Sequence, residues 1–303
     1  MLIRNATFAP WVKIRRRIAD NLPPGSRLWL RAIRDTHRHN VSIRRRDPAA
    51  SALCFYPQRP HSGYAIFRVA GDLGLRVVCS RRGRGVLTVA WCDATFVRPA
   101  AVASLPTTTL NALCLDISKS TVDRLWREVN GRGLSLDPLT TSGPMVVKSE
   151  ENAKHDGRIL SGPLRNRQPG VVYQRLVDNR EGDHLAWLRP VILGGRILLI
   201  YHKSHPLNDR FTFDAPPRTR LADPDVFSHE EADAILELAA RIGLDYGEID
   251  VLRDTDGAIY VVDVNKTPTW PGNMDEAERN HAIRRMAAAF SNLIYEHNDA
   301  DDH

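Results

Sequence analysis

The stretch Asp245-Tyr-Gly-Glu-Ile-Asp-Val-Leu-Arg-Asp-Thr-Asp-Gly-Ala-Ile-Tyr-Val-Val-Asp-Val-Asn265 decides the fold of this chain. It holds two runs of β-branched and apolar residues that are joined by Asp256-Gly257. Asp-Gly is a strong signal for a two-residue turn of type I′, because that turn needs positive φ at both central positions. The sequence therefore predicts an antiparallel hairpin centred on this dipeptide.

The predicted hairpin brings acidic side chains together. Pairing outward from the turn sets Asp250 opposite Asp263, and Asn265 shares the face of Asp263 because side chains alternate with period two. Directly opposed like charges destabilise a bare sheet. Either these acids face water on an ordinary hairpin, or they bind a hard cation such as magnesium, which prefers carboxylate oxygens plus substrate phosphates. The same register predicts two further cross-strand pairs, Thr255 with Ala258 and Arg253 with Tyr260.

The positive charge of the chain is concentrated at its N-terminus. Residues 1–47 contain twelve Lys/Arg and three Asp/Glu, a local charge of +9, so the remainder carries −3 of the total +6. The segment can form amphipathic helix, with a break expected at Pro23-Pro24-Gly25. We expect either a contact surface for an acidic partner or anionic substrate, or a solvated helical hairpin packed on the body. Nucleic acid is not expected as a partner, because no stacking pattern or known binding module accompanies the charge.

Other global features point to a reducing compartment. The four cysteines form no C-x-x-C pair, which argues against a zinc knuckle or a redox motif. No apolar run is long enough for a signal peptide or a membrane span. We therefore expect a cytoplasmic protein without membrane contact; its oligomeric state stays open, a homodimer included.

Periodicity and turn signals predict a mixed α+β chain. Expected helices cover residues 62–73, a segment from 118 or 120 to 130, 228–242 and 276–297. Expected strands cover 75–80, 86–91, 144–148, 158–160, 171–177, 188–193 and 196–203, the last two joined by Gly194-Gly195. Pro190 predicts an edge position or a bulge, and residues 204–224 predict a loop. No G-x-G-x-x-G follows a strand, so a Rossmann dinucleotide site is not supported.

The order of several short motifs resembles the ATP-grasp superfamily of the carboxylate–amine ligase type, which includes D-alanine–D-alanine ligase and glutathione synthetase. Lys119 begins a helix, Lys148 ends a strand before a polar loop, and Tyr173-Gln-Arg-Leu-Val177 follows. Then come Arg-x4-Gly-Gly from Arg189 and Asp250-x12-Asp263-x-Asn265, with a proline three residues on. The resemblance covers about residues 112–270 and implies a nucleotide held between two α+β subdomains.

The residue patterns and, for about residues 112–270, the resemblance together predict a division of the chain. It comprises a basic helical extension (1–50), a small N-terminal α/β domain (51–115), a central ATP-grasp subdomain (116–170), a C-terminal subdomain (171–297) and a disordered tail (298–303). The N-terminal domain matches no particular member, which leaves the substrate open.

Roles for individual residues follow from the resemblance. Lys119 and Lys148 are implied to contact the ATP phosphates, and residues 150–157, with His155 and Asp156, to form a lid over them. The backbone of Gln174, Arg175, Leu176 and Val177 is implied to meet the adenine, and Asp183 the ribose. Arg189 and Lys203 are the implied catalytic cations, with His202 and Arg210 as further anion contacts. Asp250, Asp263 and Asn265 are the implied magnesium ligands, for two ions that manganese can replace.

Two of these residues depart from the usual pattern. Many members carry Glu at the positions of Asp263 and Gln174. Asp is shorter by one methylene, which favours monodentate ligation, and the Gln174 amide can still pair with an amino group. Neither change removes a required function.

The expected activity is ATP-dependent ligation. A small-molecule carboxylate is activated as an acyl phosphate, ADP is released, and an amine or another nucleophile displaces phosphate. A small-molecule kinase on the same fold and a non-catalytic nucleotide-binding protein are the alternatives.

Overall fold

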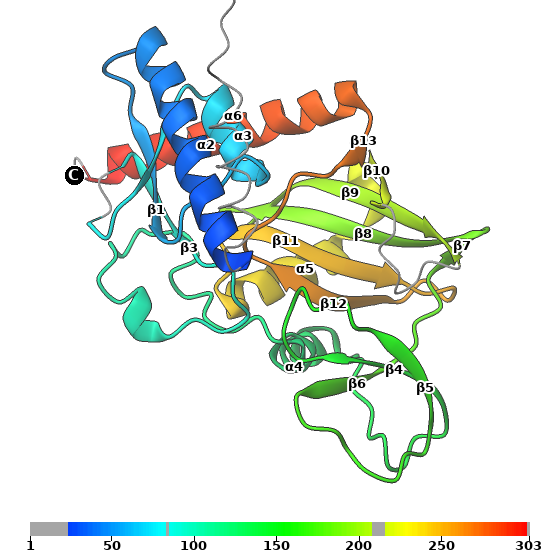
Figure 1. The fold of residues 1–303 in the computed structure, drawn as a ribbon. Coiled ribbons are helices and arrows are strands. Elements are labelled where there is room, and N and C mark those ends of the chain that lie inside the picture. The colour runs from blue at the N-terminus through cyan, green and yellow to red at the C-terminus, as the bar shows by residue number, and fades with distance from the viewer. Residues whose placement is uncertain (1–23, 83–84, 208–215, 302–303) are drawn as a thin grey trace, which may run out of the picture.

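The computed structural model describes residues 24–82, 85–207 and 216–301, and it shows an α+β chain built on three β-sheets (Figure 1). We call them the N-terminal sheet (β2-β1-β3), the middle sheet (β5-β4-β6) and the large sheet (β12-β11-β8-β9-β10-β13, with β7 paired to β8). Among the described helices, none is both long and apolar enough to cross a membrane.

The N-terminal sheet is parallel. Parallel strands are usually covered on both faces and are therefore apolar throughout, and every residue of β3 is buried. The predicted strands at 75–80 and 86–91 and the predicted helix at 62–73 are confirmed, the helix starting three residues later than expected, whereas β1 was not predicted. The elements are β1 (Ala52–Pro57), α3 (Ala65–Asp72), β2 (Arg76–Cys79) and β3 (Leu87–Trp91).

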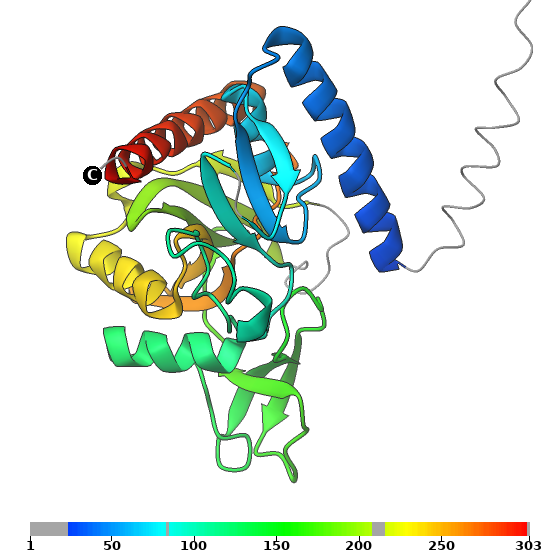
Figure 2. The ribbon, with the colours of Figure 1, turned by 90° about the vertical axis from the view of Figure 1, so that its left-hand side faces the viewer.

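Helix α2 (Pro24–Arg46) lies along the outer side of the N-terminal sheet (Figure 2). Asn40 attaches it: its Nδ2 donates to Val77 O and its Oδ1 accepts from Val77 N, both at 2.8 Å. The helix begins at Pro24, where a break was expected, because proline is well suited to the first position of a helix. The remainder of the predicted basic extension, residues 1–23, lies outside the described residues.

The middle sheet is antiparallel and follows α4 (Lys119–Asn130). Ser118 caps this helix by accepting from Thr121 N, and Gly131 ends it at φ 76°, so both predicted ends are confirmed. Lys119 is thus the first residue of the helix, and Lys148 is the second-to-last residue of β4. The strands are β4 (Gly143–Ser149), β5 (Arg158–Gly162) and β6 (Val171–Arg175).

The large sheet carries the two predicted hairpins. Gly194 and Gly195 both have positive φ, which suits the tight turn between β8 and β9. Helix α5 begins with a Ser228–Glu231 capping box and ends at Gly243, as expected. Three strands of this sheet were missed: the short strands β7 and β13, and β10, which lies in the segment predicted as a loop. The elements are β7 (Arg180–Glu181), β8 (His184–Leu193), β9 (Arg196–Pro206), β10 (Arg218–Leu221), α5 (His229–Ile242), β11 (Tyr246–Arg253), β12 (Ile259–Asn265), β13 (Asn273–Met274) and α6 (Glu276–Asp301).

The turn of the β11–β12 hairpin differs from the prediction. Arg253 pairs with Ile259, not Tyr260, and among residues 254–258 only Gly257 has positive φ, so the turn is not of type I′. The cause is Asp254, whose Oδ1 accepts from the backbone N–H groups of residues 256 and 258 at 3.1 and 2.8 Å. Such Asx hydrogen bonds stabilise a longer loop.

A β-bulge restores the expected register farther along the same hairpin. The pairing shifts by one residue between Asp250 and Val251, so that Asp250 pairs with Asp263 and Glu248 with Asn265. The predicted opposition of the two aspartates is therefore confirmed, although the turn that was used to derive it is wrong.

Pro190 lies in β8, a strand with neighbours on both sides, so the predicted edge position is wrong and the predicted bulge is confirmed. The β8–β9 register shifts between Val191 and Ile192, and the pairing of β8 with β11 is interrupted at Arg189 and Pro190. A proline without an N–H group is tolerated where a ladder is already broken.

The two faces of the large sheet are covered differently. One face packs its apolar side chains against α4 and α5. The opposite face is apolar at one end, where it meets α6 and the N-terminal sheet. Beside the middle sheet the same face is polar.

Candidate functional site

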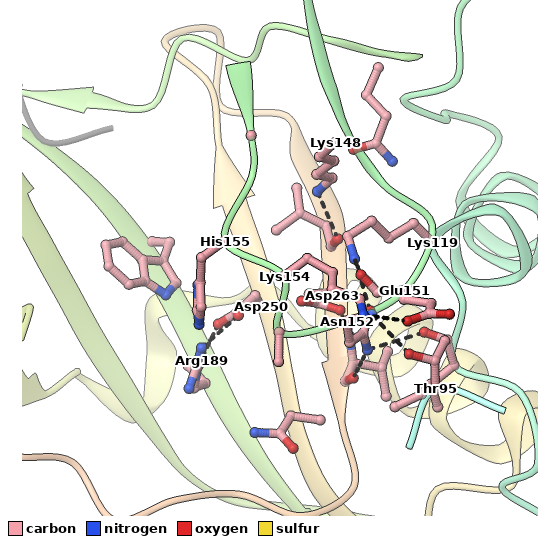
Figure 3. Close-up of a pocket in the computed structure, with 18 of the residues that line it drawn as sticks. Thr95, Lys119, Lys148, Glu151, Asn152, Lys154, His155, Arg189, Asp250 and Asp263 are labelled. Carbon is pink, nitrogen blue, oxygen red and sulfur yellow. Dashed lines mark hydrogen bonds and ion pairs between the residues drawn. The ribbon is translucent and has the colours of Figure 1, made fainter. Parts of the chain in front are cut away.

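A cavity of about 650 Å³ lies where the three sheets meet. Figure 3 shows its walls, to which the start of α4, strands β4, β8, β11 and β12, and the lid loop (residues 150–157) contribute. The structure brings eleven of the predicted residues into these walls: Lys119, Lys148, His155, Asp156, Gln174, Arg175, Val177, Arg189, Asp250, Asp263 and Asn265.

Arg189 organises the acidic side of the cavity. Its Nε and Nη2 lie 2.5 and 2.6 Å from the two carboxylate oxygens of Asp250, a bidentate geometry that is among the strongest ion pairs. Burial alone would lower the pKa of Arg189, but the Asp250 and Glu248 carboxylates raise it. Arg189 therefore remains a cation at the site.

Glu248 is a site residue that sequence reasoning missed. It is buried, lies opposite Asn265, and its Oε2 accepts from Arg189 Nη1 at 3.2 Å. Burial raises the pKa of this carboxyl group. Strand alternation could have found it, because Glu248 precedes Asp250 by two residues and must share its face.

The three predicted metal ligands lie together on one face. Asp250 and Asp263 are cross-strand partners, and Asn265 follows two residues after Asp263. Burial raises the pKa of Asp263, so a nearby cation would stabilise its charged form. Asn265 Oδ1 accepts from Thr267 N at 3.0 Å and has a second lone pair. Within the described residues no group of three or more His, Cys, Asp or Glu side chains could hold a metal alone. Two carboxylates and an amide suit a magnesium ion that takes its remaining ligands from substrate phosphates.

Two lysines approach the acidic residues from the other wall (Figure 3). Lys148 Nζ donates to Val262 O at 3.3 Å, and burial lowers the pKa of Lys148 to about 8 against the opposing attraction of Asp263. Lys119 Nζ donates to Glu151 O and Asn152 Oδ1, both at 2.9 Å. Both lysines that the resemblance implies as phosphate contacts thus line the same cavity. In the structure the Lys148 ammonium group contacts β12 and the Lys119 ammonium group contacts the lid loop.

Part of the predicted adenine linker lines the cavity. Gln174 is buried in β6, and Arg175 Nη1 donates to the Tyr260 hydroxyl at 3.1 Å. Val177 packs with Leu134 and Tyr260 in a small apolar cluster. Leu176 does not line the cavity.

Asp183, the implied ribose contact, lies outside the cavity walls. Its side chain is 90% exposed and accepts from His184 Nδ1 at 2.6 Å, because the tight turn at Gly182 directs this end of the β7–β8 hairpin into solvent. Asn179 is present in the wall instead: it is 6% exposed, and its Oδ1 has no hydrogen-bond donor. A buried polar atom without a partner could not be recognised from the sequence.

Lys203 and His202 lie on opposite faces of β9. Lys203 pairs with Trp187, so it shares the face of Arg189, and it is 8% exposed. Burial and the Arg189 guanidinium lower the pKa of Lys203 to about 8. His202 instead points away, with its Nε2 2.9 Å from Glu181 Oε2, so its predicted substrate contact is wrong. Arg210 lies outside the described residues.

The chain was compared with known proteins. No family model and no curated protein matches it. Among solved structures, the ATP-grasp ligase PsnB complexed with minimal precursor, Mg and ADP gives a TM-score of 0.54 at 13% identity, covering 78% of this chain and 96% of that one. PsnB with a phosphomimetic variant of its minimal precursor, Mg and ADP gives 0.51 at 13% identity, covering 78% and 99%. At such identities the likeness shows the fold alone: the chain has the ATP-grasp fold, as its motifs predicted.

Proposed function

We propose that this ATP-grasp protein is an ATP-dependent ligase that activates a carboxylate as an acyl phosphate and joins it to an amine. The observation that carries the proposal is the cavity in which Lys119 and Lys148 face the Asp250–Asp263 pair. Phosphoryl transfer is catalysed mainly by positioning and by neutralising charge, and this arrangement supplies both.

The nucleotide is assigned to the end of the cavity beside the middle sheet. Backbone groups of residues 174–177 meet the adenine edge, and the apolar side chains of Val146 and Leu252 line the adjacent wall. A ribose hydroxyl donates to Asn179 Oδ1, which satisfies that buried acceptor. Lys119 exchanges its contacts with the lid loop for a phosphate contact when the nucleotide binds.

Asp250, Asp263 and Asn265 would hold a magnesium ion, whose charge would neutralise the phosphates. Arg189, which Asp250 and Glu248 hold at this side of the cavity, would contact the transferred phosphoryl group with its guanidinium. Lys203 does not line the cavity, but its ammonium group lies close enough to Arg189 to act as a second cation behind it.

The reaction proceeds in two steps that balance. A carboxylate oxygen of the acid substrate attacks the γ-phosphorus, and the bond to ADP breaks. The nitrogen of the amine then attacks the acyl carbon and loses a proton, and phosphate leaves with the electron pair of the broken C–O bond. The lid loop excludes water, which would otherwise hydrolyse the acyl phosphate.

The amine is placed at the end of the cavity nearest the N-terminal sheet. Asp93 lines this end, where its two carboxylate oxygens accept from the Tyr64 hydroxyl at 3.1 Å and from Thr267 Oγ1 at 3.0 Å. A carboxylate that two neutral donors hold in place suits an incoming ammonium group.

The test is a two-stage assay. Calorimetry with Mg²⁺–AMPPNP first measures nucleotide binding, and absence of binding would overturn the proposal. Amino acids and dipeptides are then screened, singly and in pairs, for ATP-dependent phosphate release. A ligase releases phosphate only with an acid and an amine together, and hydroxylamine in place of the amine gives a hydroxamate. A kinase would give a stable phosphorylated product from one acceptor, and binding without turnover would indicate a non-catalytic protein.

A further inference from the structure

Asn152 joins the lid loop to three separate segments of the chain (Figure 3). Its Nδ2 donates to Ile117 O at 3.3 Å, just before α4, and to Val264 O at 3.0 Å in β12. Its backbone N–H donates to Thr95 Oγ1 at 2.8 Å, in the segment that follows β3. One residue of the lid loop therefore depends on the relative position of all three segments.

The lid loop needs such contacts to keep its shape. Ala153 and His155, on either side of Lys154, have φ values of 60° and 50°. Residues with a Cβ adopt positive φ at a cost, and they persist there only when surrounding contacts hold them. Loss of the contacts at Asn152 should therefore release the loop rather than only loosen one hydrogen bond.

Thr95 connects the lid loop with the wall assigned to the amine. Residues 92–95 all line the cavity, and they include Asp93. Thr95 itself is buried and its backbone O accepts from Ile117 N at 3.0 Å. The Thr95 hydroxyl thus belongs to the same segment, residues 92–95, that the amine would contact.

We infer that Thr95 and Asn152 are positioning residues that couple closure of the lid loop to the seating of residues 92–95, the segment at which the amine binds. The inference rests on the proposed function. If the lid loop closes before the amine is in place, the acyl phosphate has no amine to react with and is hydrolysed when the loop reopens, so that ATP is wasted. The Thr95–Asn152 hydrogen bond gives the lid loop a direct contact with that segment.

The test measures backbone hydrogen exchange in Thr95→Val, which removes the acceptor but keeps the shape of the side chain. We expect roughly fivefold faster exchange in residues 150–157, the factor given by loss of one ordinary hydrogen bond. Thr95→Ser should restore the wild-type rate. Thr36→Val is the matched control, because the Thr36 hydroxyl is buried without a partner and lies in α2.

The reciprocal variant tests coupling rather than local packing. Asn152→Ala should speed exchange in residues 92–96 as well as in the lid loop, because coupling between two segments acts in both directions. Affinity for Mg²⁺–AMPPNP should change less than about twofold in Thr95→Val, since the closed loop remains the major species. Wild-type exchange in both variants, with Mg²⁺–AMPPNP still bound, would overturn the inference. Failure of the wild-type protein to bind Mg²⁺–AMPPNP would instead overturn the proposed function.

Discussion

Ile249 and Asp250 are neighbours in β11, yet they lie on opposite faces of the large sheet and in opposite environments. Ile249 is fully buried among the apolar side chains beneath α4 and α5. Asp250 points into the cavity and binds Arg189. The same strand thus stabilises the fold with one face and holds the candidate site with the other.

Four charged groups of the polar face are not stabilised in their charged form by the folded protein, in contrast to Arg189, whose pKa is raised. Burial raises the pKa of Glu248 and Asp263 and lowers the pKa of Lys148 and Lys203. In each case the folded protein disfavours the charged form. A buried ion pair is weak evidence for stability, so we interpret these groups as a site whose charges are completed by a bound ligand.

The largest expected effect is the loss of ATP turnover after a substitution on the polar face alone. Asp263→Ala should lower magnesium-dependent ATP turnover on the order of 1000-fold, because the metal loses a carboxylate ligand and the phosphates lose their neutralising charge. The far-ultraviolet circular dichroism spectrum should be unchanged. Asp256→Ala, at the exposed tip of the same hairpin, is the matched control and should keep wild-type turnover. Wild-type rates in Asp263→Ala would refute the metal site.

A substitution on the apolar face should lower stability and leave nucleotide affinity unchanged. Ile249→Ala should reduce the free energy of unfolding by about 2–5 kcal/mol, the usual cost of a cavity left by a fully buried aliphatic side chain. Chemical denaturation measures this change, and Ile249→Val should cost only about 0.5–1.5 kcal/mol. Affinity of the folded protein for Mg²⁺–AMPPNP should stay near the wild-type value. A large loss of affinity would show that the two faces are not independent.

A smaller effect belongs to the polar face and depends on pH. Burial lowers the pKa of Lys148 to about 8, with Lys119 acting in the same direction and Asp263, Asp250 and Asp123 acting against it. Below pH 8 the ammonium group is charged, and above pH 8 the free protein must take up a proton to bind the triphosphate. Affinity for Mg²⁺–AMPPNP should therefore be about tenfold weaker at pH 9 than at pH 7.

Lys148→Arg is the control for this pH dependence. The guanidinium group stays charged over the whole range, so the variant should lose the part of the slope between pH 7 and pH 9 that belongs to Lys148 and keep only the part contributed by Lys203, whose pKa is also lowered to about 8. Calorimetry in buffers of different ionisation enthalpy measures the proton uptake directly. The same slope in the variant would assign the titration to another group.

The sequence was informative wherever a local rule was strong. The capping box at Ser228, the glycines after α4 and α5, and the Gly194-Gly195 turn fixed element ends correctly, because each depends on residues adjacent in the chain. The β11–β12 hairpin shows the limit. Its turn was wrong because the Asp254 side chain stabilises a longer loop, and the Asp250–Asp263 pairing was right because a bulge compensates for the difference.

The residues of the candidate site likewise fall into those that a local motif predicts and those that only the folded structure reveals. Residues with a motif, such as Lys119, Lys148 and Asp263, were predicted and do line one cavity. Asn179 and Thr95 were missed, because their importance depends on contacts across long stretches of sequence or on a missing partner. His202 was misplaced, although alternation along the predicted strand that ends at Lys203 puts these two neighbours on opposite faces.

The smallest expected effect comes from the helix cap at Ser228, at one end of a helix that covers the apolar face. Ser228 caps α5, which covers that face and contributes no residue to the cavity. Ser228→Ala should lower the free energy of unfolding by about 1 kcal/mol, and the melting temperature by about 2 °C for a chain of this size. Ser291→Ala, at an exposed position inside α6, should leave both unchanged. Because α5 reaches the site only through the thickness of the large sheet, affinity for Mg²⁺–AMPPNP should not change. A change in affinity without one in melting temperature would mean that motion of α5 reaches the nucleotide, and the division of labour between the faces would then fail.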